Sequence, residues 1–190
     1  MSLPHILLGL LDEPASGYDL KKIFERALGH FWAAELSQIY PTLKQLERRG
    51  WLDVRTAPSE KGPSRRLYQR TDTGTQVLCE WLTDGPEVGT ERLTWLAQVF
   101  LLSEIGGPGR ALRFMIDLRE AMAGRLAALS AAEAHWQSAD PRYPDKLPDH
   151  GFYRHLTLQL GLSRMAATRD WCDDCIAQIR VRYQMPEEAA

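Results

Sequence analysis

The sequence predicts a mostly α-helical chain with one small β-hairpin, and three observations predict it. Three short amphipathic segments, each bounded by turn-forming residues, occupy the first fifty positions. A strand-like alternation follows on both sides of a run rich in glycine, proline and serine. Beyond residue 110, two long stretches space their apolar residues as helices do. With 190 residues, the chain is long enough for one large domain or two small ones.

The composition is typical of a globular protein, with 44% apolar and 25% charged residues. No apolar run is long enough to span a bilayer, and the apolar start lacks the basic residues of a signal peptide. Three cysteines are too few for a disulfide framework, so we expect a reducing cytoplasm. The net charge of −2 hides a local surplus, because residues 36–70 contain eight basic and three acidic side chains. Such a basic segment favours a polyanionic partner.

The first two helices are expected within residues 3–28. Residues 3–11 form a short buried helix. Ser16 is an N-cap residue type and begins the second helix, which Gly29 ends. The aromatic residues Phe31 and Trp32 in the following connection are expected to pack in the core.

The third segment, residues 37–49, has the features of a helix that can enter the major groove of DNA. Ser37 is an N-cap residue type, and Gly50 ends the segment as a C-terminal glycine does. Three apolar residues lie four and three positions apart, so they are expected to form one inward face: Ile39, Leu43 and Leu46. The opposite face carries side chains that can reach bases or phosphates: Gln38, Thr42, Lys44, Gln45 and Arg48. Most amphipathic helices merely expose such a face to solvent.

A basic β-hairpin is expected directly after this helix. Residues 51–55 and 65–70 can form its strands, and residues 57–64 suit its tip. Thr71 then offers a cap for a fourth helix. Three helices followed by a hairpin are the order of a winged helix-turn-helix, in which the third helix enters the major groove and the hairpin rests on the flanking backbone. The alternative is a small α+β domain with a solvated basic hairpin.

We therefore expect a winged helix-turn-helix domain over residues 1–84 and a long-helix domain over residues 85–190. The second domain shows helical patterns at 90–102, 110–136 and 152–183. In the last of these, apolar residues follow the seven-residue repeat of a helix–helix seam: Leu158, Leu162, Met165, Cys172, Ile176 and Ile179. Arg169 is the one charged member of the repeat.

Several blocks of sequence carry a resemblance to a known family. They follow one another in the first half of the chain: residues 6–11, 16–20, 31–32, 37–43, 46–52, 65–68 and 71–74. This half resembles the amino-terminal domain of the PadR family of bacterial transcriptional regulators. Phe152, Tyr153 and Arg154, with Gly161 and Trp171, resemble more loosely the carboxy-terminal helical domain of the longer PadR proteins. The resemblance implies a homodimeric winged-helix repressor, released from DNA by a small molecule, with the seam of the last helix at the dimer interface.

On this fold, Gln38 and Thr42 are expected nearest the bases, with Tyr40 and Pro41 beside a thymine methyl group. A second set is expected to hold phosphates of a double-stranded operator: Ser37, Lys44, Arg65, Arg66 and Tyr68. The same fold can also activate transcription. A further alternative is a ligand- or redox-responsive interaction protein that no longer binds DNA.

Three aromatic residues, Trp95, Phe100 and Trp136, are expected to line a pocket for a small aromatic effector, since relatives bind flat aromatic compounds. The alternative is that they are ordinary core residues. No cofactor, metal or catalytic site is expected, because the chain has no HExxH, no GxSxG and no glycine-rich phosphate loop after a strand.

The pair Cys172 and Cys175 forms a CxxC motif that needs its own interpretation. It lies inside a long predicted helix and encloses two acidic residues, which disfavour a thiolate. No second ligand pair for zinc is evident. We expect structural thiols, with a redox sensor as the alternative.

Overall fold

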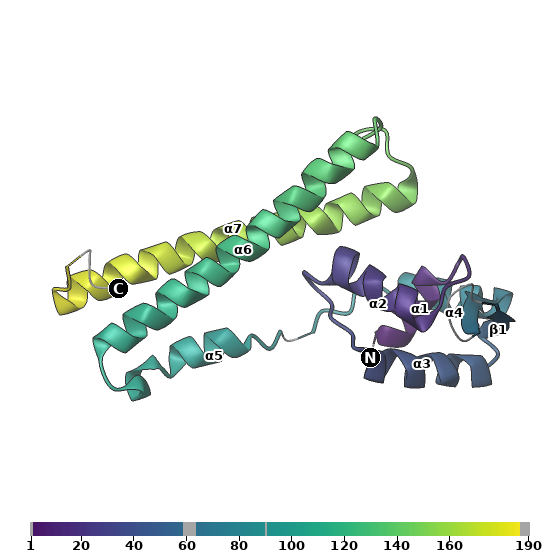
Figure 1. Cartoon of the computed structure of the whole chain (residues 1–190), viewed down its shortest axis with the longest axis horizontal. Coiled ribbons are helices and arrows are strands. Elements are labelled where there is room, and N and C mark those ends of the chain that lie inside the picture. The colour runs from purple at the N-terminus through teal and green to yellow at the C-terminus, as the bar shows by residue number, and fades with distance from the viewer. Residues whose placement is uncertain (1, 59–63, 90, 187–190) are drawn as a thin grey trace. The chain divides into compact units, whose positions relative to one another are not determined.

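The computed structural model describes residues 2–58, 64–89 and 91–186, which fall into two compact units (Figure 1). The first unit is Met1–Gly89 and the second is Thr90–Ala190. Helices dominate both units, and the described strands form one two-stranded sheet. The predicted fold class is confirmed. The tip of the hairpin predicted at 57–64 lies largely outside the described residues.

The first unit consists of four α-helices and the hairpin. Its elements are α1 (Leu3–Leu10), α2 (Gly17–Ile23), the π-helical turn η1 (Phe24–Leu28), α3 (Leu36–Arg48), β1 (Leu52–Ala57), β2 (Arg65–Arg70) and α4 (Asp72–Thr83). The strands are antiparallel, with Leu52 opposite Arg70. Ala15 adds an isolated bridge to β2, since it exchanges backbone hydrogen bonds of 3.0 and 2.9 Å with Tyr68. The sequence analysis did not predict this bridge.

The core of the first unit fixes the orientation of α3. Leu8 of α1 and Leu20 of α2 are fully buried together with Ile39 and Leu43 of α3. Burial of each such side chain contributes about 1.5–3 kcal/mol. The inward face predicted for the third helix is therefore confirmed, and its polar residues are directed outward.

Two helix starts in this unit have the side-chain caps that the sequence predicts. Ser16 Oγ accepts from the Asp19 N–H at 3.2 Å, and the Asp19 carboxylate accepts from the Ser16 N–H at 3.1 Å. The hydrogen bond from the Ser16 side chain lowers the pKa of Asp19. Thr71 Oγ1 accepts from the Gly74 N–H at 3.1 Å and caps α4.

The second unit is built on a long helical hairpin. Its elements are α5 (Thr94–Phe100), the 3₁₀ turn η2 (Leu102–Ile105), α6 (Pro108–Ala139) and α7 (Asp149–Tyr183). α6 and α7 run antiparallel and cross along their length (Figure 1). Leu112 and Met115 of α6 share one buried cluster with Cys172 and Ile176 of α7. Within the described ranges, no helix is both long and apolar enough to cross a membrane.

Four of the six predicted seam residues in α7 belong to the cluster shared with α6 of the same chain: Met165, Cys172, Ile176 and Ile179. Cys172 is fully buried in that contact, and Leu158 and Ile176 are 7% and 8% exposed. The other predicted seam residues, Leu162, Met165 and Ile179, are half-buried. The expected dimer seam is thus partly covered within one protomer, because the helical hairpin brings α6 alongside it. Arg169, the charged member, forms an ion pair with Asp170 at 2.6 Å.

Replacing Gly74 by alanine should destabilise the first unit by about 1–3 kcal/mol. A Cβ at this position would overlap the carbonyl oxygen of Trp51 and press on Leu8, so α4 would have to shift. Urea denaturation measures the change in the free energy of unfolding. Gly9→Ala is the control, because its Cβ would meet only Leu78 at 4.0 Å, and it should be neutral or stabilising by up to about 1 kcal/mol. Equal effects of the two variants would contradict this packing.

Candidate nucleic-acid interface

Helix α3 begins one residue earlier than predicted. Its N-cap is Glu35, whose N–H donates to the side-chain oxygen of Gln38 at 3.0 Å. Lys21 of α2 pairs with Glu35 at 2.8 Å and ties the two helices together. The expectation that Ser37 caps this helix is wrong, and Ser37 is instead an exposed residue of its first turn.

The outer side of α3 holds most of the predicted DNA-contacting residues. Exposed on it are Ser37, Gln38, Tyr40, Pro41 and Lys44, and Thr42 is half-buried. Because the side-chain oxygen of Gln38 is used in the cap, its amide NH₂ group is the part left for a base. Thr42 Oγ1 donates to the Gln38 carbonyl at 2.7 Å, which leaves the hydroxyl's lone pairs as acceptors.

Pro41 and Tyr40 shape the beginning of this surface. Pro41 lies inside α3 rather than in its first turn, so the Ser37 carbonyl lacks its usual helical donor. Tyr40 is 46% exposed, and its ring covers the start of α2. A Cβ on Gly17 would come within 2.6 Å of that ring. Gly17 therefore makes room for Tyr40 at the surface.

Arg65 and Arg66 are both exposed at the start of β2, but their surroundings differ. Arg66 donates two hydrogen bonds to the Glu47 carboxylate of α3, at 2.8 and 2.9 Å. Arg65 contributes weakly to the lowered pKa of Asp19, for which the Ser16 hydrogen bond is the main cause. Within the described ranges, neither Arg65 nor Lys44 has an ion pair. These two cations are available to phosphates, whereas Arg66 holds the hairpin against α3.

Tyr68 does not belong to the exposed surface. It is 3% exposed, lies opposite Val54 in the hairpin and packs in the core. Burial raises the pKa of its hydroxyl. Tyr68 is therefore not placed to make the phosphate contact that the sequence suggested, because the strand alternation turns this side chain inward.

Three more basic residues of the 36–70 segment make internal contacts. Arg70 donates to the Leu8 carbonyl at 2.9 Å, and Arg48 donates to the Lys44 carbonyl at 3.3 Å. Arg49 lies over Trp51, 4.9 Å from its ring centroid. Only part of the basic surplus seen in the sequence is therefore free to meet a polyanion.

The three residues expected to line an effector pocket do not come together within one chain. Trp95 lies 5.9 Å from Trp171, and Trp136 lies 6.4 Å from His155, between ring centroids. His155 and Trp171 are both in α7, sixteen residues or about 24 Å apart. Phe100 is 86% exposed.

The CxxC motif lies inside α7, as predicted. Burial raises the pKa of Cys172 to about 11, and Cys175 and Asp173 add to the effect. Burial and Asp174 also raise the pKa of Cys175. Both thiols are thus poor nucleophiles, which disfavours a redox sensor. The part of the chain that the structure describes contains no group of three or more ligands suited to a metal ion.

A polar helix face beside a basic hairpin is the arrangement of a winged helix-turn-helix, and comparison with known proteins agrees. Residues 6–80 match the model of the transcriptional regulator PadR-like family, and residues 91–180 match the virulence activator alpha C-terminal model. The chain is 31% identical over 179 residues to the negative transcriptional regulator PadR of Bacillus subtilis, covering 93% of this chain and 97% of that protein. The chain belongs to the PadR-like family of transcriptional regulators.

Solved structures resemble this PadR-like regulator over both units. The B. subtilis PadR complex with operator DNA has a TM-score of 0.78 at 28% identity and covers 94% of this chain and 99% of that one. The complex of the same protein with p-coumaric acid has a TM-score of 0.70 at 29% identity and covers 93% of this chain and 94% of that one. The Vibrio cholerae virulence activator AphA has a TM-score of 0.73 at 25% identity and covers 95% of this chain and 99% of that one. The predicted family and DNA-binding regulatory function are confirmed.

Arg66 and Glu47 of the PadR-like regulator should be coupled by about 0.2–1 kcal/mol, since both side chains are partly exposed. A double-mutant cycle with Glu47→Ala and Arg66→Ala, followed by urea denaturation, measures this coupling. The exposed α6 pair Arg113 and Asp117 provides a comparison within a single helix. No coupling between Arg66 and Glu47 at low salt would show that the pair does not hold the hairpin.

Proposed function

We propose that this PadR-like regulator is a homodimeric repressor that binds a pseudo-palindromic operator and leaves it when a small effector binds. The observation that carries the proposal is the exposed polar face of α3, together with Lys44 and Arg65, which form no ion pair with any residue that the structure describes. The 31% identity to a negative regulator supports repression. Activation is the second candidate, favoured by the likeness to the V. cholerae virulence activator.

On this proposal, α3 enters the major groove and reads base edges with its first two turns. The amide NH₂ of Gln38 donates to a base acceptor, and Thr42 offers an acceptor oxygen. Tyr40 and Pro41 provide apolar contact to a thymine methyl group. Phosphates are held by Ser37, Lys44 and Arg65. Arg66 acts as a positioning residue, because its ion pair with Glu47 sets the hairpin beside α3.

A second copy of the chain is needed to read two half-sites about 34–36 Å apart. Since α6 already covers part of the predicted seam, a more exposed apolar surface of α7 is the better candidate for contact with this copy. Phe152, Leu156 and Leu160 are 45%, 43% and 58% exposed and recur every four residues, so they form one apolar stripe. We infer that this stripe contacts the partner subunit, since a continuous apolar stripe on a long helix favours association.

The effector would act by a shift between two dimer geometries. B. subtilis PadR has been solved both with operator DNA and with p-coumaric acid. A ligand that favours a geometry with a different spacing or tilt of the two α3 helices lowers operator affinity without touching the DNA. The size of this decrease in operator affinity is set by the ratio of the ligand's affinities for the two geometries.

Replacing Lys44 or Arg65 by alanine should weaken operator binding and reduce its salt dependence. Each lost phosphate contact lowers the slope of log affinity against log salt by about one, hence about two in a homodimer. Fluorescence anisotropy with the protein's own upstream DNA, between about 50 and 200 mM salt, measures both quantities. Arg125→Ala, which removes an exposed charge from α6, is the matched control. Unchanged affinity and slope in both variants would refute the phosphate contacts.

Leu156→Asp should convert the dimer to a monomer, because it places a carboxylate in the apolar stripe. Light scattering coupled to size-exclusion chromatography measures the mass. Loss of the second half-site contact should also weaken operator binding by about a hundredfold or more. Ala128→Asp puts the same charge on the exposed side of α6 and should leave the mass unchanged. A dimeric Leu156→Asp protein would exclude the stripe as the interface.

A further inference from the structure

The connection between the two units carries one anchored carboxylate on each side of the boundary between them. Helix α4 ends at Thr83 and α5 begins at Thr94, so residues 84–93 join the units. Within this connection, Glu87 and Glu91 each accept hydrogen bonds on both carboxylate oxygens. Glu87 and its donors belong to the first unit, whereas Glu91 and its donor belong to the second. Each unit therefore holds its own end of the connection.

Glu87 is tied to the first unit by the beginning of α1 and the end of α4. The Trp81 indole N–H of α4 donates to Glu87 Oε1 at 3.0 Å, and the hydroxyl of Ser2, the N-cap residue of α1, donates to Oε2 at 3.3 Å. The indole is stacked on His5 of α1, with 4.7 Å between ring centroids and 3° between the ring planes. The Trp81 hydrogen bond is the main reason why the pKa of Glu87 is lowered, so the carboxylate is charged at neutral pH. The chain is thus tied to this unit shortly after α4 ends.

Glu91 is tied to the second unit by α7. Arg164 donates two hydrogen bonds to its carboxylate, at 3.0 and 2.6 Å, which is the directional, bidentate geometry of an arginine–carboxylate pair. Further along the chain, Trp95 of α5 packs against Trp171 of α7, with 5.9 Å between ring centroids. Arg164 and Trp171 are two helical turns apart, so they lie on the same side of α7. The connection is therefore fixed to α7 before α5 begins.

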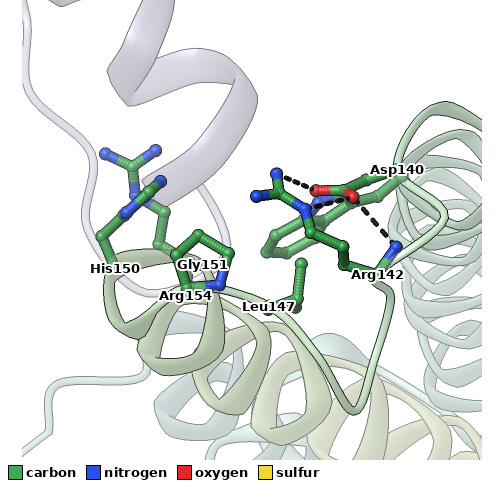
Figure 2. Close-up of a pocket in the computed structure, with 8 residues that line it drawn as sticks. Asp140, Arg142, Leu147, His150, Gly151 and Arg154 are labelled. Carbon is green, nitrogen blue, oxygen red and sulfur yellow. Dashed lines mark hydrogen bonds and ion pairs between the residues drawn. The ribbon is translucent and has the colours of Figure 1, made fainter.

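The second unit is held together along α7, so a position fixed at Arg164 applies to the whole helical hairpin. Near the start of α7, the Tyr143 hydroxyl lies 2.9 Å from Nδ1 of the buried His155. Between α6 and α7, Arg142 donates hydrogen bonds of 2.9 Å to both carboxylate oxygens of Asp140, and Figure 2 shows this pair beside a small pocket. Towards the other end, α6 and α7 share the buried cluster described above.

The two tethers shorten the part of the connection that is free to extend. A chain spans at most about 3.3–3.6 Å per residue, so without tethers the reach from Thr83 to Thr94 would be about 36–40 Å. With both carboxylates held, only residues 88–90 lie between the tethers, and the reach from Glu87 to Glu91 is about 13–14 Å. The tethers therefore reduce the maximum reach of the connection about threefold.

We propose that Glu87 and Glu91 are positioning residues for operator binding, which act by limiting the reach of the connection. The inference rests on the proposed function, in which two α3 helices must meet two half-sites about 34–36 Å apart. Since the partner subunit is held through the second unit, the connection decides how far each α3 can depart from that spacing. A shorter free connection raises the effective concentration of the second α3 at its half-site once the first α3 has bound. The tethers therefore act both on operator affinity and on the preference for one half-site spacing.

The tethers themselves are tested without DNA, by electron paramagnetic resonance measurement of a distance within one full-length chain. Spin labels are attached to Cys79, an exposed cysteine of α4, and at position 128 of α6 through Ala128→Cys. Cys172 is fully buried and does not compete for the label, and Cys175→Ser removes the remaining thiol. Mixing the labelled protein with an excess of unlabelled protein restricts the measured distance to a single chain.

The distance distribution should broaden in Glu87→Ala and in Arg164→Ala, since each change frees one end of the connection. Glu87→Gln should restore part of the narrow distribution, because its amide oxygen still accepts from the Trp81 indole. Asp84→Ala is the matched control, since it removes a carboxylate of the same connection that forms no hydrogen bond or ion pair with any residue that the structure describes. A distribution that stays narrow in both tether variants would overturn the tethers.

The positioning role is tested with operator DNA of two half-site spacings. Footprinting of the protein's own upstream DNA locates the half-sites, and a second DNA has two base pairs inserted between them. The double variant Glu87→Ala/Arg164→Ala should bind the natural DNA about fivefold more weakly, because its free connection is longer. Its preference for the natural over the lengthened DNA should fall by about the same factor, whereas Asp84→Ala should change neither quantity. Fluorescence anisotropy measures the affinity for both DNAs.

Broader distances with unchanged operator affinity and unchanged spacing preference would overturn the positioning role. Equal weakening on both DNAs would also overturn it, because a loss of folding or of phosphate contacts acts on both DNAs alike. If the unaltered protein binds no upstream DNA, the proposed function fails and the positioning role fails with it, while the distance measurement still decides whether the tethers exist.

Discussion

Burial of the apolar side of α3 is the constraint on which the DNA-binding surface depends. Ile39, Leu43 and Leu46 are at most 1% exposed, packed in the core to which α1 and α2 contribute. A helix has one rotation about its axis that buries these three residues together. That rotation directs Lys44 and Gln38 to solvent. Stability and function thus select the same orientation, since any rotation that buried the polar face would leave unpaired polar groups in the core.

Contacts with the same core also fix the position of the hairpin. Tyr68 inserts its ring there and exchanges backbone hydrogen bonds with Ala15, while Arg70 donates to the Leu8 carbonyl. Outside the core, the pair of Arg66 and Glu47 joins β2 directly to α3. The hairpin and α3 therefore form one rigid body, which carries both the proposed phosphate contacts and the proposed base contacts. Rigid placement of this kind allows backbone contacts to set the register at which bases are read.

Periodicity and caps predicted the elements well because they are local properties of the chain. Ser16, Thr71 and the inward residues of α3 lie where the sequence placed them. The partners of exposed charges were not predictable, since Arg66 meets Glu47 across nineteen positions. The basic neighbours of Tyr68 suggest an exposed residue, whereas strand alternation correctly indicates its burial. The repeat in α7 correctly indicates a helical partner, but a repeat cannot say whether that partner is α6 or a second chain.

The first turns of α7 carry the proposed dimer stripe and are also tied to α6 of the same chain. Gly151 and His155 are buried there, and the Tyr143 hydroxyl lies 2.9 Å from His155 and donates to Glu133 of α6 at 2.8 Å, so these turns are fixed to the end of α6. A ligand that moves this end by a small amount also moves the stripe, because a packed helix shifts as a unit. Linkage then makes the effect reciprocal: if the proposed effector weakens operator binding by some factor, operator DNA weakens effector binding by the same factor. Comparing the affinity of the effector with and without operator would therefore measure the coupling from the side where no DNA contact is involved.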